Sequence, residues 1–219
     1  QGLVPRLMAA QFVKPFRKNS AIKNDRQDAE AIATAARQGN MRFISVKTED
    51  QQARLSWHRV REGYKKDALA VMNRIRGLLS EFGIVIGQSA IALRRALADL
   101  EAMQLPPEFV QLVRLQQRYW EAIAACQEAC DVRIKEHAEQ DERCERIRGL
   151  TGVGPLTADA IVATLGNASD FKNGRQCAAW MGLTPSQFGT GGKVQLGKIS
   201  CRGDSYLRTL LIQGARSSL

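Results

Sequence analysis

The middle of the chain carries apolar residues at the spacing of long amphipathic helices. Over residues 49–83 the apolar positions recur at steps of three, four, five or seven, which predicts one long helix. A broken apolar segment follows over residues 91–105 and stops at two prolines, and another long pattern covers residues 109–146. Two helices of this length most simply pack antiparallel, or pair with the same region of another chain. We therefore predict a coiled-coil-like region over residues 49–146.

The first 48 residues have a different pattern, with short apolar pieces around a basic run at residues 14–23. The piece at residues 7–10 suits a strand or a helix, whereas residues 43–46 favour a strand because β-branched residues follow a turn. Between them, an Ala-rich stretch that follows Asn24 favours a helix ending at Gly39. We expect a small unit of mixed helices and strands over residues 1–48.

The last part of the chain, residues 147–219, has two glycine-rich segments among apolar patterns. The first segment, Gly152-Val153-Gly154-Pro155, separates two predicted helices. Pro155 suits the first turn of the second helix, where its missing N–H costs nothing. The free N–H groups at that helix start favour phosphate. We therefore predict that Gly152, Val153 and Gly154 contact a nucleic-acid backbone.

The second segment places three glycines around Thr190. Because glycine has no side chain, the backbone can approach a ligand closely and the Thr190 hydroxyl can project without being shielded by neighbouring side chains. Basic side chains follow, and their spacing offers partners to several phosphates while leucines bury one helix face. We predict that the phosphate-binding side chains are Lys193, Lys198, Arg202 and Arg208.

Composition supports a folded chain with a polyanionic partner. The chain has 219 residues, of which 44% are hydrophobic, and a formal net charge of +10. Residues 1–48 and 146–219 each carry nine Lys/Arg against three Asp/Glu, whereas residues 49–145 carry 14 against 16. The two ends are therefore the candidate nucleic-acid surfaces. Five cysteines without a zinc-binding spacing indicate a reducing cytoplasm, and no segment is apolar enough to span a membrane.

Three sequence blocks carry a family resemblance: GLTGVGPLTADAIVATLGN, FKNGRQCAAWMGLTP and GGKVQLGKISCRGDSYLRTLLIQGAR. Together they resemble the C-terminal transposase domain of the DEDD insertion-sequence recombinases, which are related to the Piv-type DNA invertases. The resemblance implies a bacterial enzyme that cuts and rejoins DNA through a hydroxyl nucleophile in this domain. It also implies metal-binding carboxylates in an N-terminal RuvC-like domain and, in the RNA-guided branch, a structured bridge RNA that selects the DNA.

The acidic residues Asp25 and Asp28 admit two interpretations. They lie three residues apart at a predicted helix start, so their side chains project to the same side. In the first interpretation they cap the helix, because an acidic residue there satisfies free N–H groups and interacts favourably with the helix dipole. The resemblance instead matches KNDRQDAEAI to the last two acidic positions of the DEDD set, which implies that Asp25 and Asp28 are catalytic and bind Mg²⁺. Carboxylate oxygens are the ligands that this hard cation takes.

This sequence departs from the family pattern in two places. Only 24 residues precede Asp25, and none is Asp or Glu, so we expect an N-terminally truncated member that is inactive alone. The family serine is also absent, because the two positions at which it would lie are Gly189 and Thr190. We expect Thr190 to be the nucleophile in preference to Ser186, with a degenerate, inactive loop as the competing interpretation.

The predicted fold class is thus mainly α. It comprises a RuvC-like α/β remnant (1–48), a long helical region (49–146) and a small α-helical domain with a helix-hairpin-helix (147–219). Two other functions stay open: a non-catalytic DNA-binding module, and a helical oligomerisation scaffold that dimerises through residues 49–146. For the protein itself we expect a homo-oligomer, either a dimer or a tetramer. His58 and His137 have no neighbouring Ser or Cys arrangement, so we expect them at the surface or an interface.

Overall fold

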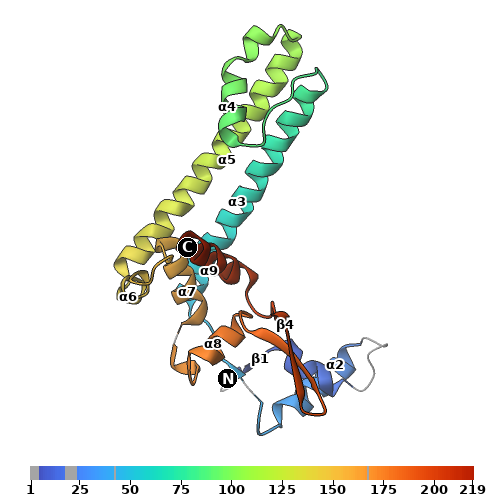
Figure 1. The fold of residues 1–219 in the computed structure, drawn as a ribbon, viewed down its shortest axis with the longest axis vertical. Coiled ribbons are helices and arrows are strands. Elements are labelled where there is room, and N and C mark those ends of the chain that lie inside the picture. Colours follow the sequence, from blue (N-terminus) through green and yellow to red (C-terminus); the bar gives the residue numbers. More distant parts are fainter. Residues whose placement is uncertain (1–4, 18–23, 42, 167) are drawn as a thin grey trace. The chain divides into compact units, whose positions relative to one another are not determined.

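The computed structural model describes residues 5–17, 24–41, 43–166 and 168–219 and is mainly helical, as the sequence predicts. The chain divides into two compact units, Gln1–Thr48 and Glu49–Leu219 (Figure 1). The predicted division into residues 1–48, 49–146 and 147–219 stays a prediction. Among the described helices, none combines the length and the apolar character needed to cross a bilayer.

The first unit is a short antiparallel strand pair with helices between its strands. Strand β1 (Leu7–Met8) pairs with β2 (Phe43–Ile44). Helix α1 (Ala10–Val13), the 3₁₀ turn η1 (Lys14–Phe16) and helix α2 (Asp25–Ala36) lie between them. The predicted strand near residue 43 and the predicted helix after Asn24 are confirmed. The rest of the basic run, residues 18–23, lies outside the described residues.

Two long antiparallel helices form the largest part of the second unit (Figure 1). Helix α3 (Glu49–Ser80) and helix α5 (Pro107–Gln140) bury a shared apolar core. The segment between them contains α4 (Ala90–Ala98) and the 3₁₀ turn η2 (Leu100–Met103), whose leucines close the far end of this core. The fully buried core residues include Ile75, Leu79, Leu93, Leu97, Leu100 and Val113.

The second long helix is shorter than predicted, because it ends at Gln140 and not near residue 146. Asp141 has an extended backbone, and its side chain caps the next helix, α6 (Glu142–Arg148), by accepting a hydrogen bond from the N–H of Arg143. The apolar period continues across this break, so the pattern alone does not reveal it.

The C-terminal part continues with α7 (Pro155–Leu165), η3 (Ala168–Asp170) and α8 (Gly174–Trp180). Strands β3 (Pro185–Thr190) and β4 (Lys193–Ile199) then form a two-stranded antiparallel ribbon before α9 (Ser205–Ser217). The sequence analysis predicted an α-helical C-terminal domain and did not predict these two strands. Gly191 and Gly192 have φ values of 59° and 78°, the left-handed conformations that a two-residue hairpin turn requires.

Helix α9 packs against the turn between α6 and α7 through a contact between two glycine backbones. A Cβ atom added to Gly152 would lie 2.4 Å from the carbonyl oxygen of Gly214, and one added to Gly214 would lie 2.1 Å from the carbonyl oxygen of Gly152. Gly152 also has a φ of +83°. The turn and the helix can therefore approach this closely only without side chains at both positions.

We expect Gly152→Ala to destabilise the second unit by more than about 2 kcal/mol, because left-handed backbone strain adds to overlap with a main-chain oxygen. Gly154→Ala is the matched control, since its φ is −85° and nothing lies within 4 Å of an added Cβ; its cost should stay below about 1 kcal/mol. Urea unfolding of both variants measures the difference. Equal stabilities would contradict this account of the turn.

Candidate nucleic-acid interface

Thr190 lies at the tip of the ribbon, as the last residue of β3. It faces Lys193, the first residue of β4, across the Gly191-Gly192 turn. Both side chains are exposed. The glycine before Thr190 is also constrained, because a Cβ at Gly189 would lie 3.3 Å from the carbonyl oxygen of Lys193. The ribbon therefore presents a hydroxyl and an ammonium group side by side at an open tip.

Ser186, the competing hydroxyl, has a different environment. It lies at an irregularity in the strand register between Pro185 and Gln187, and it is half-buried. Its hydroxyl donates a hydrogen bond to the carbonyl oxygen of Lys198 at 3.1 Å. A side chain at Gly197 would also collide with the Ser186 hydroxyl, at 2.5 Å. Ser186 thus ties the two strands together, whereas Thr190 is exposed at the tip.

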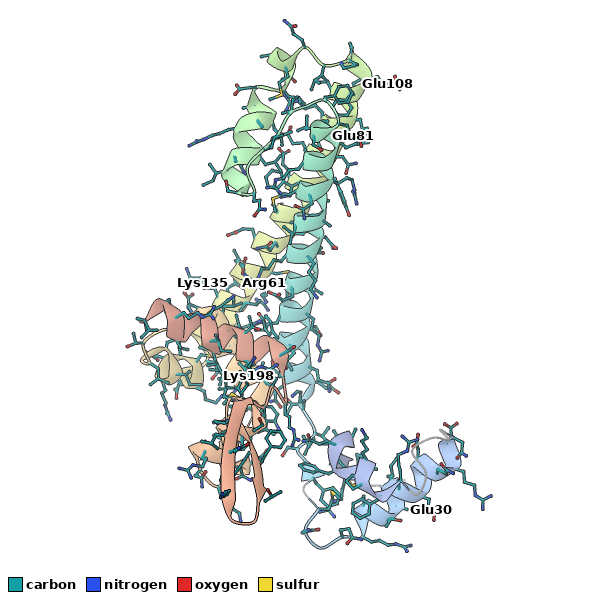
Figure 2. The ribbon with its side chains drawn as sticks, turned by 45° about the vertical axis from the view of Figure 1, so that its right-hand side comes forward. Glu30, Arg61, Glu81, Glu108, Lys135 and Lys198 are labelled. Carbon is teal, nitrogen blue, oxygen red and sulfur yellow. The ribbon has the colours of Figure 1, made fainter. Side chains whose placement is uncertain are left out.

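The predicted phosphate-binding residues fall into two groups. Lys193 and Lys198 on β4 and Arg202 after it are exposed; Figure 2 labels Lys198 on the ribbon. Arg208 is half-buried, and its Nη1 donates to the carbonyl oxygens of Met181 at 3.4 Å and Arg202 at 3.2 Å. Arg208 therefore fastens the segment before α9 to the end of α8, which leaves it less suited to a phosphate than the three exposed residues.

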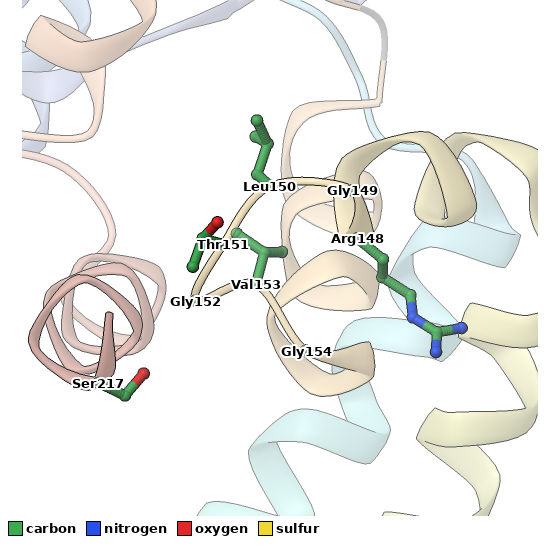
Figure 3. Close-up of a pocket in the computed structure, with 8 residues that line it drawn as sticks. All are labelled: Arg148, Gly149, Leu150, Thr151, Gly152, Val153, Gly154 and Ser217. Atoms are coloured by element: carbon green, nitrogen blue, oxygen red, sulfur yellow. The ribbon is translucent and has the colours of Figure 1, made fainter. Parts of the chain in front are cut away.

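The turn between α6 and α7 borders a shallow depression of about 410 Å³ (Figure 3). Its lining consists of residues 148–154 and Ser217, with the guanidinium of Arg148 at one side. Gly154 precedes α7 without contributing a side-chain cap, and the start of a helix without such a cap favours an anion. Val153 differs from its glycine neighbours, because it packs against the buried cluster that contains Cys144 and Val162. Gly154 is therefore the exposed glycine of this turn, whereas Gly152 is half-buried against α9.

The acidic pair lies in the first turn of α2, but Asn24 supplies the cap, since its side chain accepts from the N–H of Gln27 at 2.8 Å. Asp28 lies 3.1 Å from the Nε of Arg17. Two carboxylates in one helical turn fit part of a Mg²⁺ ligand set, and the cation would compete with Arg17 for Asp28. Among the described residues no group of three His, Cys, Asp or Glu side chains could hold a metal ion, so Asp25 and Asp28 fit a partial site only.

Sequence reasoning missed a buried polar cluster at the base of the two long helices. Asp159 on α7 is fully buried, and both of its oxygens are engaged. Arg54 on α3 donates to Oδ1 through Nε at 2.9 Å and also through Nη2. His58, one turn further along α3, lies 2.8 Å from Oδ2 through Nε2. Because an ionised carboxylate only accepts hydrogen bonds, Nε2 carries the proton in this contact.

The cluster extends from Asp159 to two more helices. The Nδ1 atom of His58 lies 2.9 Å from the hydroxyl of Tyr206 on α9. Arg54 also donates through Nη1 to Asp141, at 2.7 Å, at the junction of α5 and α6. Asp159 and Arg54 therefore connect α3, α7 and the junction of α5 and α6, and His58 connects this cluster to α9. His58 is only 1% exposed, so the expectation of a surface or interface position for it is wrong.

The pKa values of the ionisable groups in this cluster reflect their burial and their hydrogen bonds. Burial by itself raises the pKa of Asp159, but the hydrogen bonds from His58 and Arg54 outweigh burial and hold the pKa below its ordinary value. The hydrogen bond from Arg143 is the main reason that the pKa of Asp141 lies well below its ordinary value. Burial raises the pKa of Tyr206 to about 12. Both carboxylates are therefore held in the charged form that their cationic partners require.

Two family profiles match the chain. One, described as the transposase IS116/IS110/IS902 family, matches residues 144–219. The other, a DEDD transposase profile of IS110 elements described as a transposase, matches residues 3–84.

Three bacterial relatives are similar along nearly the whole chain. A probable family 20 transposase of Pseudomonas aeruginosa is 43% identical over 220 residues, which cover 99% of this chain and 64% of that protein. The transposase for insertion sequence element IS1328 of Yersinia enterocolitica is 38% identical, over 96% of this chain and 63% of the relative. That for element IS1111A of Coxiella burnetii is 38% identical, over 100% and 60%. The chain thus spans less than two thirds of the length of these relatives.

We expect Asp159→Asn to destabilise the second unit by about 3–5 kcal/mol, because it leaves Arg54 buried with one anionic partner fewer. Glu142→Gln is the control, since its pair with Arg146 is exposed on both sides and should contribute less than about 1 kcal/mol. Urea unfolding at neutral pH compares the two variants. A cost for Asp159→Asn as small as that for Glu142→Gln would contradict the structural role of the cluster.

The same carboxylates predict an acid limit. The pKa values of Asp141 and Asp159 are lower in the folded than in the unfolded state, so acidification protonates the unfolded chain first. Their contribution to stability should be complete above about pH 5 and decline as the pH falls below about 4. Urea unfolding across this range should show a shallower decline for Asp159→Asn than for the unmodified chain. If the free energy of unfolding fell equally with pH in Asp159→Asn and in the unmodified chain, Asp159 would not contribute to the acid sensitivity.

Proposed function

We propose that this chain, which belongs to the IS110/IS116 family of insertion-sequence transposases, is part of a recombinase that cuts and rejoins DNA through the hydroxyl of Thr190. One observation supports the proposal above all: the loop that resembles the family's nucleophile loop forms an exposed hairpin tip that ends in a hydroxyl. The nucleophile needs such an open position to reach a phosphodiester in a duplex.

The proposed step is a transesterification. Thr190 Oγ1 attacks phosphorus, so a bond from Oγ1 to phosphorus forms while the bond from phosphorus to a deoxyribose oxygen breaks. The threonine proton leaves to a base and the departing deoxyribose oxygen gains a proton. The covalent protein–DNA phosphodiester keeps the energy of the broken bond, and attack by another deoxyribose hydroxyl reverses the step and rejoins the strand. Lys193, across the turn from Thr190, would stabilise the charge on the attacked phosphate.

Asp25 and Asp28 would contribute to a Mg²⁺ site near the scissile phosphate. When bound, Mg²⁺ supplies positive charge that stabilises the pentacoordinate phosphorus. The two aspartates lie in the first turn of α2 and offer oxygen ligands on one side of the helix. The proposal requires Asp28 to leave Arg17 when the cation binds. The other ligands would come from the phosphate, from water and from further carboxylates of the kind that the DEDD resemblance implies.

The DNA backbone would be held by the exposed cations and by the glycine turn. Lys193, Lys198 and Arg202 are exposed, and the Gly152–Gly154 turn precedes α7 without a side-chain cap from Gly154. We propose that α6, this turn and α7 act as a helix-hairpin-helix, which contacts phosphates without selecting sequence. Binding of this kind should weaken steeply with salt, because each phosphate contact releases counterions.

The proposal extends to the partners of the protein. The resemblance implies a structured guide RNA, and the two long helices favour pairing with a second copy of the chain. We also propose that the protein acts in the bacterial cytoplasm, at the nucleoid. The net charge of +10 suits either nucleic acid, and a dimer or tetramer would supply a cleavage site from each copy to act on two DNA partners.

A second candidate is a DNA-binding role without catalysis. It is supported by the threonine at the position of the family serine and by the incomplete ligand set of the described residues. It predicts salt-sensitive DNA binding with no strand cleavage, even by a longer form that also carries the part of the relatives that this chain does not span.

We expect Thr190→Ala to reduce strand cleavage by that longer form at least about 1,000-fold, because it removes the attacking atom. Thr190→Ser should keep or raise the activity, since it removes only the methyl group beside the hydroxyl. Ser186→Ala is the matched control and should cleave like the unmodified protein. Cleavage of DNA carrying the ends of the element, measured beside DNA affinity, tests these expectations. Cleavage that persists in Thr190→Ala and disappears in Ser186→Ala would assign the nucleophile to Ser186.

A further inference from the structure

The ribbon of β3 and β4 is exposed along most of its length and lies in a stretch of sequence whose charged residues are all basic. Every residue of β4 is exposed, and Phe188, Val194 and Leu196 keep 69%, 57% and 71% of their accessible surface. From Phe171 to Gly203 the chain has no acidic residue and five basic ones. Exposed apolar side chains next to like-signed cations suit a partner that is both polyanionic and partly apolar.

The strand register divides the ribbon into two faces. Cross-strand partners share a face, and successive residues alternate between faces. One face, here called the Thr190 face, therefore carries Thr190 with Lys193 and Phe188 with Gln195. The opposite face carries Gln187 with Leu196 and Gly189 with Val194. The two exposed glutamines, Gln187 and Gln195, thus point in opposite directions.

The Thr190 face combines four chemical groups: a hydroxyl, an ammonium, an amide and an aromatic ring. Phe188 extends towards Gly197, where an added Cβ would lie 3.5 Å from the ring. The side chain of Gln195 is exposed, and no hydrogen bond holds its amide to the part of the chain that the structure describes. An ammonium suits a phosphate, an amide pairs with the edge of adenine, and a phenylalanine contacts the methyl group of thymine.

We propose that the Thr190 face lies in the major groove of double-stranded DNA and that Gln195 selects an adenine there. This inference rests on the proposed function, because it assumes that the ribbon contacts DNA, and it adds a direct readout of sequence by the protein. The major groove of B-DNA admits a two-stranded ribbon, whereas the major groove of an RNA helix is too deep and narrow for side chains to read. Duplex DNA is therefore the partner that this geometry favours.

The inference gives different roles to neighbouring side chains. Lys193 holds the backbone and should affect all sequences alike. Gln195 should affect one position of the site, because its amide can accept from N6 of adenine and donate to N7. Phe188 should favour thymine at an adjacent position through its ring. Gln187 is the matched control, since it is an equally exposed glutamine on the other face of the same ribbon.

Selection from a pool of DNA duplexes with a short randomised window tests the inference on the 219-residue chain. The unmodified chain should enrich adenine at one position by about 5- to 150-fold over guanine, as one bidentate contact implies. Gln195→Ala should lose that enrichment, and Gln187→Ala should keep it. Lys193→Ala should weaken binding to every duplex and lower the slope of log affinity against log salt by about one. Thermal melting should show that the variants are folded.

The outcomes separate this inference from the function on which it rests. Salt-sensitive binding with the same selected sequences for Gln195→Ala and the unmodified chain would overturn the readout and leave the proposed function standing. Enrichment lost in Gln187→Ala but kept in Gln195→Ala would also overturn it, because the wrong face would then contact DNA. Tighter binding to an RNA duplex than to any selected DNA would also overturn the readout. Absence of DNA binding at low salt would remove both proposals.

Discussion

The second unit depends on a carboxylate that has no access to water. Asp159 would be costly to bury alone, and it is tolerated because Arg54 and His58 of α3 engage both of its oxygens. Arg54 is satisfied in turn by Asp141. These contacts place the start of α3, the end of α5 and the middle of α7 at fixed distances, which nondirectional apolar packing alone would not do.

The same cluster also affects the ribbon indirectly. Tyr206, in the first turn of α9, forms a hydrogen bond with His58 of α3. Helix α9 starts six residues after β4 ends. The contact between Gly152 and Gly214 holds the other end of α9 against the glycine turn. The helix that follows the ribbon is therefore fixed at both ends to the part of the molecule that includes the predicted phosphate-binding turn. The ribbon itself extends from this support with exposed residues on both faces.

Local sequence patterns predicted the elements that depend on local interactions. The periods that give α3 and α5, the helix that starts after Asn24 and the glycine turn before α7 all follow from spacing and capping. The ribbon was missed although its signal was present, since Gly191-Gly192 between Thr190 and Lys193 is a typical two-residue hairpin turn. The buried cluster could not be found in this way, because Arg54 and Asp159 are 105 residues apart. The available hint was that Asp159 is the single charged residue of a largely apolar helix.

The account of function depends on Thr190 becoming covalently joined to DNA. The most direct measurement is to trap the protein–DNA complex formed by the longer protein on DNA that carries its element ends, digest both polymers, and identify the modified peptide by mass spectrometry. The account predicts one peptide that includes Thr190, with a nucleotide on that side chain. A nucleotide on Ser186 or on any residue outside the ribbon tip, or cleaved DNA without a protein-linked product, would contradict it.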